Sequence, residues 1–117
     1  MITKGIRGAI TVDANTVEAI QDATVELFRE LIRKNSLIEK QVSHIIFTVT
    51  NDLNAVYPAK FVRSVIGWNN TALMCLPELQ IENSLPMCIR VMIIYTCVES
   101  FIPKYVYLKG AANLRSN

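Results

Sequence analysis

The spacing of apolar side chains predicts one long amphipathic helix near the start of the chain. Between residues 15 and 35, apolar residues recur every three or four positions, and acidic residues come first while basic residues come last, as the helix dipole prefers. Asn15, with Glu18 three residues later, has the pattern of a capping box. We therefore expect Asn15 to cap this helix and Asn35 to end it.

Segments rich in β-branched residues predict strands on either side of this helix. The expected strands are residues 2–12, 44–50, 71–76, 87–97 and 104–108. Pro58 suits a first helical position, so we expect a short second helix over 59–66 that stops at Gly67. The order of elements favours an α+β (or α/β) fold with a mixed β-sheet and helices packed on one face, in a single domain of residues 1–117.

Arg90 interrupts the most apolar run of the chain, residues 87–94. Such a run reads as a strand buried on both faces or as a buried helix segment. An arginine stays ionised, and an unpaired charge in such surroundings is costly. We therefore expect an anion against Arg90, which could be an internal carboxylate such as Glu78, a chain terminus or a ligand.

Composition narrows the classes of function. Hydrophobic residues make up 51% of a small chain, which suggests that some are buried between subunits. The net charge of +2, with acids and bases interspersed, argues against nucleic-acid binding. No apolar run has the ~20 residues of a membrane span, and no signal peptide is visible. Three cysteines without CxxC spacing fit reduced thiols, so we expect a cytoplasmic protein.

The residues that remain for chemistry are mostly cationic. With one histidine, no GxGxxG and no P-loop, we expect an enzyme to work here without metal, cofactor or covalent nucleophile. The candidates are Arg7 between two glycines, Lys60 and Arg63 on one helical face, Glu78 after a strand, Arg90 and Tyr107. Such a set binds a small polyanion and stabilises charge that develops during a reaction.

Each of these residues also has an ordinary structural interpretation. Arg7, Lys60, Arg63 and Glu78 are equally typical of solvated surface charge. Tyrosines at strand spacing commonly pack, and Cys75 reads as a small buried hydrophobe. From the residues alone, a plain interaction module in which Arg90 is neutralised internally therefore stays open.

An ordered series of short blocks resembles a known family. The blocks are Gly5–Ala9, Asp52–Arg63, Gly67-Trp68, Cys75, Glu78, Cys88–Met92, Val106–Leu108 and Asn113–Arg115. In order and spacing they resemble the AroH class of monofunctional chorismate mutases over nearly the whole chain. The resemblance implies a homotrimer, a pseudo-α/β barrel with active sites between subunits. It also implies the Claisen rearrangement of chorismate to prephenate, in phenylalanine and tyrosine biosynthesis, without a cofactor.

The resemblance also implies roles for individual residues. Arg90 would face the ether oxygen of the breaking bond, Arg7 and Tyr107 would bind carboxylates, and Glu78 and Cys75 would lie near the ring hydroxyl and the allylic fragment. The adjacent subunit would supply Tyr57, Ala59, Lys60 and Arg63. Leu73 and Met74 would line the cleft, and Leu114 and Arg115 would belong to a C-terminal segment over its mouth. Tyr57 stands where phenylalanine is usual, and Met74 where threonine is familiar. A trimeric imine deaminase of the RidA type, or an anion-binding trimer without catalysis, is the alternative.

Overall fold

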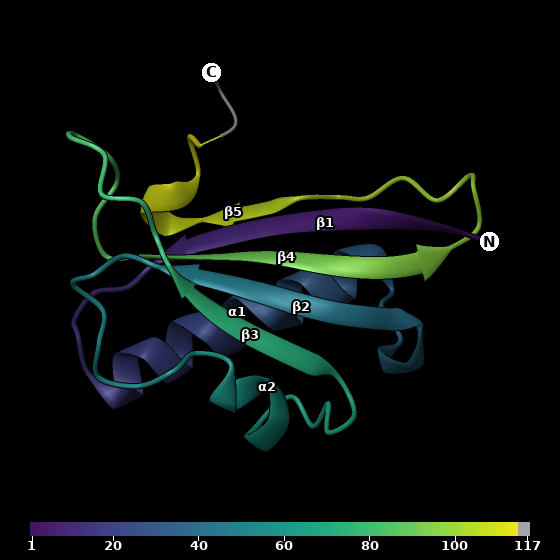
Figure 1. The fold of residues 1–117 in the computed structure, drawn as a ribbon, viewed down its shortest axis with the longest axis horizontal. Coiled ribbons are helices and arrows are strands. Elements are labelled where there is room, and N and C mark those ends of the chain that lie inside the picture. Colours follow the sequence, from purple (N-terminus) through teal and green to yellow (C-terminus); the bar gives the residue numbers. More distant parts are fainter. Residues whose placement is uncertain (115–117) are drawn as a thin grey trace.

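The computed structural model describes residues 1–114 and shows a five-stranded mixed sheet (Figure 1). Its strands are β1 (Ile2–Thr11), β2 (Val42–Val49), β3 (Ala72–Pro77), β4 (Cys88–Cys97) and β5 (Val106–Leu108), in the spatial order β3-β2-β4-β1-β5. The central β4 is antiparallel to both neighbours, whereas the edge strands β3 and β5 run parallel to β2 and β1. The predicted mixed sheet is confirmed.

Two α-helices cover one face of this sheet (Figure 1). Helix α1 (Val17–Asn35) buries Leu27, Phe28 and Leu31 in the same core as the sheet residues Ile45, Phe47 and Ile93. Helix α2 (Lys60–Ser64) is shorter than predicted, and its Phe61 and Val62 join that core. Two 3₁₀ turns, η1 (Glu39–Gln41) and η2 (Lys109–Ala111), complete the elements of the described residues. None of the helices in this part of the chain is long and apolar enough to cross a membrane.

The N-terminus of α1 differs from the prediction by one residue. Thr16, not Asn15, is the cap, and its hydroxyl accepts a hydrogen bond from the Ala19 backbone N–H at 3.1 Å. Asn15 instead accepts from the backbone N–H groups of Asn54 and Ala55, at 2.9 and 3.0 Å. The Asn15 side chain therefore ties the start of α1 to the loop that precedes α2. Thr16, whose backbone is extended, instead supplies the oxygen that accepts from a free N–H in the first turn of the helix.

The C-terminal end of α1 is hydrogen-bonded to the segment that precedes β5. Asn35 is the last helical residue, as predicted, and its side chain is buried. Its amide donates to the Lys104 carbonyl at 2.9 Å and accepts from the Lys104 N–H at 2.7 Å. Two hydrogen bonds from one side chain fix the segment that leads to Tyr107.

No α-helix of the described residues lies on the second face of the sheet, although the 3₁₀ turn η2 contributes Ala111 to a small buried cluster with Ala9 and Cys88 there. Along β4, burial alternates: Ile89, Val91 and Ile93 are buried on the helix side, while Arg90 and Met92 lie on the other face and are half-buried. The prediction of a strand buried on both faces is therefore wrong for a single chain, because both α-helices pack on the same side. The Arg90 side chain keeps 37% of its surface exposed. We call this second surface the open face.

Candidate active site

Strand register gathers several of the predicted residues on the open face. Thr48 and Ala9 lie opposite Arg90 on its two neighbouring strands, and Tyr107 lies opposite Ala9 on β5. Arg7, two residues before Ala9, projects from the same face because side chains alternate along a strand. A cavity of about 200 Å³ is lined by Arg7, Arg90, Tyr107 and Leu114, among others. We call this group, together with Glu78, the open-face site.

The anion beside Arg90 is a carboxylate of the chain itself. Glu78 follows β3, and its backbone N–H donates to the Val49 carbonyl at 2.9 Å, which extends the pairing of β2 and β3 by one step. Its Oε1 lies 2.9 Å from Arg90 Nε, and the same oxygen accepts a hydrogen bond from the Thr48 hydroxyl. The Nε–H makes no aligned hydrogen bond, so the contact is an ion pair rather than a directed bond. Arg90 is thus paired and also faces a cavity.

Tyr107 and Arg7 complete the polar lining of this cavity. The Tyr107 hydroxyl is buried and has no hydrogen-bond partner among the described residues. A buried hydroxyl without a partner costs free energy, which a ligand oxygen could recover. The Arg7 guanidinium lies 5.9 Å from the centroid of the Tyr105 ring, within the range of a cation–π contact. Leu114, which also lines the cavity, packs against the buried cluster of Ala9, Cys88 and Ala111.

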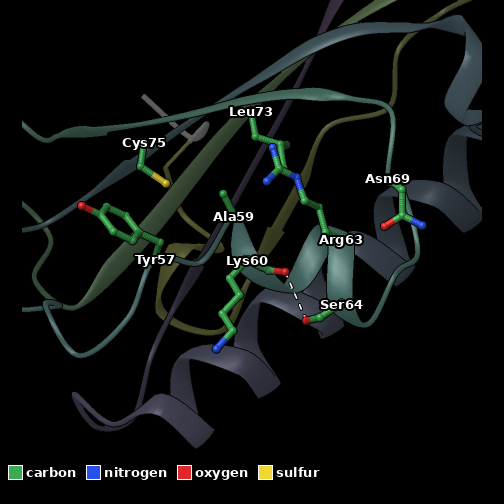
Figure 2. Close-up of a pocket in the computed structure, with 8 residues that line it drawn as sticks. All are labelled: Tyr57, Ala59, Lys60, Arg63, Ser64, Asn69, Leu73 and Cys75. Atoms are coloured by element: carbon green, nitrogen blue, oxygen red, sulfur yellow. Dashed lines mark hydrogen bonds between the residues drawn. The ribbon is translucent and has the colours of Figure 1, made fainter.

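A second group of predicted residues lies on the helix side of β3, in a cleft of about 530 Å³ (Figure 2). In register, Leu73 lies opposite Ile45 and Cys75 opposite Phe47, so both point to the helix side. Figure 2 shows Arg63 extending from α2 toward Leu73. The lining residues are Tyr57, Ala59, Lys60, Arg63, Ser64, Asn69, Leu73 and Cys75. We call this group the helix-side cleft.

The Cys75 thiol lies in this cleft, on the face of the sheet opposite to that of Arg90. Burial raises the pKa of Cys75, and a hydrogen bond with the backbone of Ala59 lowers it by less. The raised pKa means that the group is a neutral thiol near pH 7, able to donate a weak hydrogen bond but poorly nucleophilic. Cys75 is therefore suited to contact a ligand, not to attack it.

The two groups do not meet within one chain, because the sheet separates them. Arg7, Glu78, Arg90, Tyr107 and Leu114 belong to the open face. Tyr57, Ala59, Lys60, Arg63, Leu73 and Cys75 belong to the helix-side cleft. Met74 points away from its neighbours Leu73 and Cys75 and is 58% exposed on the open face. Arg115 lies outside the described residues.

Sequence reasoning missed Thr48. Its hydroxyl contacts the carboxylate that pairs with Arg90, although Thr48 and Glu78 are 30 residues apart in the chain. A weak signal was present: within the apolar strand β2, Thr48 falls two residues after Ile46 and so on the face opposite the buried Phe47. Only the pairing of β2 with β4 shows that this position faces Arg90.

Comparisons with known proteins identify relatives of this chain. The family model described as chorismate mutase type I matches residues 3–117. The chorismate mutase AroH of Bacillus subtilis is 37% identical over 116 residues, which covers 98% of this chain and 91% of the relative. That of Thermus thermophilus is 38% identical over 116 residues, covering 97% and 94%.

A solved structure shows the same fold. The chorismate mutase from Clostridium thermocellum superposes with a TM-score of 0.86 at 46% sequence identity, covering 92% of this chain and 96% of that one. Three findings agree. The family model matches almost all of the sequence, two curated relatives are more than 35% identical, and the solved structure has the same fold. The chain belongs to the chorismate mutase type I family.

Proposed function

We propose that this chorismate mutase converts chorismate to prephenate by an intramolecular Claisen rearrangement, a step toward phenylalanine and tyrosine. Membership of the family supports the reaction. The observation that carries the site is the state of Arg90: its Nε pairs with Glu78, while its side chain lines a cavity shared with Arg7 and Tyr107. The closest contact of that pair is made through Nε.

The chemistry follows from where charge develops. In the rearrangement a C–O bond breaks as a C–C bond forms within one molecule, and the ether oxygen gains partial negative charge in the transition state. A cation fixed beside that oxygen stabilises the transition state more than the substrate, which raises the rate. Arg90 is assigned this role, and Arg7 and Tyr107 bind the substrate carboxylates. No covalent intermediate is needed, so the neutral thiol of Cys75 is compatible with the mechanism.

A homotrimer would complete the site. The half-buried apolar residues of the open face, such as Ile46, Met92 and Ile94, are suited to packing against other subunits. The helix-side cleft of a neighbour would then supply Tyr57 as a wall and Lys60 and Arg63 as positive charge. Leu73 and Cys75 would come with them, because they line the same cleft. The three cysteines are free thiols, which supports placing the protein in the cytoplasm.

Loss of the ultraviolet absorbance of chorismate at catalytic protein concentration tests the reaction directly. We expect chorismate to be consumed with prephenate as the product. A parallel assay with a 2-imino acid tests the deaminase alternative, for which we expect no turnover. Turnover of the imine alone would refute the proposal. A bicyclic dicarboxylate that mimics the transition state should raise the melting temperature of the protein, whereas a plain interaction module would not respond to it.

A further inference from the structure

We propose that Thr48 is a positioning residue that keeps the Glu78–Arg90 pair open to the substrate. The inference rests on the proposed function, because it assigns Thr48 a part in the same site. Its hydroxyl donates a hydrogen bond to Glu78 Oε1, the oxygen that also lies 2.9 Å from Arg90 Nε. One carboxylate oxygen is therefore shared between a neutral donor and a cation.

Strand register places the Thr48 hydroxyl between its two partners. β2 lies between β3 and β4, and Thr48 is opposite Leu76 on one side and Arg90 on the other. Glu78 is two residues beyond Leu76 and so projects from the same face. The Glu78 carboxylate reaches Arg90 across Thr48. The hydrogen bond from the Glu78 backbone N–H to the Val49 carbonyl fixes the backbone position from which this side chain extends. This geometry comes from the pairing of β2 with β3 and β4 and from the backbone bond that holds Glu78 directly after β3.

The shared oxygen changes how Arg90 and Glu78 can pair. A carboxylate and a guanidinium without other constraints favour a bidentate contact through two parallel N–H···O bonds. That contact would use both carboxylate oxygens and a terminal nitrogen of Arg90. Here the closest contact of the ion pair joins Nε to Oε1, the same oxygen that accepts the hydrogen bond from Thr48. By holding Oε1, Thr48 keeps Oε2 and the terminal nitrogens available to a ligand.

The alternative is that Thr48 is present only as a β-branched residue that suits a strand. Valine has nearly the same shape and lacks the hydroxyl, whereas serine keeps the hydroxyl and lacks the methyl group. Thr48→Val and Thr48→Ser therefore separate the two interpretations. Thr96→Val is a matched control, because Thr96 is half-buried on the open face of β4 about 20 Å from Arg90.

The experiment measures kcat and KM for chorismate, affinity for the bicyclic dicarboxylate analogue, oligomeric state and melting temperature for each variant. We expect Thr48→Val to lower kcat/KM about 10- to 100-fold, the scale for losing a hydrogen bond to a charged group. Thr48→Ser and Thr96→Val should stay within about 3-fold of the unaltered protein. If Thr48→Val does not fold, Thr48→Ala against Thr48→Ser gives the same comparison.

A double-mutant cycle with Glu78→Ala distinguishes positioning from general packing. Without the carboxylate there is nothing for the hydroxyl to hold, so Thr48→Val should change kcat/KM less than about 2-fold in that background. Equal losses in both backgrounds, an unaffected Thr48→Val or a loss in Thr48→Ser as large as in Thr48→Val would each overturn the inference. Should the unaltered protein fail to turn over chorismate, the proposed function fails, and the affinities for the analogue still decide the role of Thr48: equal affinities refute it.

Discussion

The open-face site and the helix-side cleft differ in what fixes their side chains. In the open-face site, Arg90, Glu78 and Thr48 are held by the pairing of three adjacent strands and by contacts with one another. In the helix-side cleft, Tyr57 precedes a five-residue helix and is 73% exposed. The Glu78 side chain, by comparison, is only 19% exposed. One region is preorganised within a chain, and the other presents side chains outward.

This difference suggests that the two regions would have different roles in the proposed trimer. Electrostatic stabilisation of a transition state needs charges that are already in place, which a paired sheet provides. Closing a cleft around a substrate tolerates more adjustment, which side chains on a short helix and its preceding loop provide. We therefore expect changes in the open-face site to lower kcat, and changes in the helix-side cleft to act mainly on KM.

Replacing Arg90 by lysine should have the largest effect. Lysine keeps the charge but loses the planar guanidinium, which pairs through Nε and presents two further nitrogens. We expect kcat to fall at least ~10²-fold, the scale for losing a donor to a developing oxyanion. Steady-state kinetics measure the change, and size-exclusion chromatography should show the same oligomer as before. Turnover close to that of the unaltered protein would refute the role of Arg90.

Mixing two impaired variants tests whether the two regions meet across a subunit boundary. Arg90→Lys lowers kcat through the open-face site and Arg63→Ala raises KM through the helix-side cleft, so well below the KM for chorismate neither alone should retain substantial activity. If each site takes one region from each of two subunits, random co-assembly in equal amounts gives about a quarter of the sites both intact regions. Co-expressed chains with different tags should therefore recover about a quarter of the activity of the unaltered protein.

The control for this mixture is Arg90→Lys combined with Glu78→Ala, because both changes lie in the open-face site. Those two variants damage the same region, so no combination of subunits restores an intact one. Activity in that control equal to the first mixture, or no recovery in the first mixture, would contradict the assignment of the regions to different subunits.

Glu78→Ala should have a smaller effect on rate and little effect on stability. The carboxylate orients Arg90 but the pair is partly exposed, and such pairs contribute about 0–1 kcal/mol to the free energy of unfolding. We expect kcat/KM to fall about 10-fold or more, while the melting temperature changes by only a few degrees. Kinetics and calorimetry on the same preparation measure both. A large drop in melting temperature with little loss of activity would instead identify a structural pair.

The contrast between the two regions also explains what the sequence could predict. Periodicity located α1 and the five strands, and the ionised Arg90 in an apolar run correctly predicted an anion beside it, with Glu78 as a candidate. The prediction that β4 is buried on both faces was wrong for a single chain, because a run of apolar residues does not reveal that the α-helices cover only one side of the sheet. The contact of Thr48 with Glu78 and the separation of Cys75 from Arg90 depend on strand register, which local spacing does not contain. The cap at Thr16 was missed because the side chain of Asn15 binds a loop distant in sequence.

Tyr57→Phe should have the smallest effect. Because it removes only the hydroxyl and keeps the ring, it tests whether the helix-side cleft binds substrate through the shape of this side chain alone. Tyr57 lines the cleft but is largely exposed, so we assign its ring the role of an apolar wall and its hydroxyl no specific contact. Removing the hydroxyl should change kcat/KM less than about 2-fold, whereas Tyr57→Ala should raise KM roughly 10-fold by removing aromatic area that the bound substrate would cover. The same steady-state assay resolves both changes. A loss in Tyr57→Phe as large as in Tyr57→Ala would mean that the hydroxyl binds the substrate, and that the cleft is as specifically built as the open-face site.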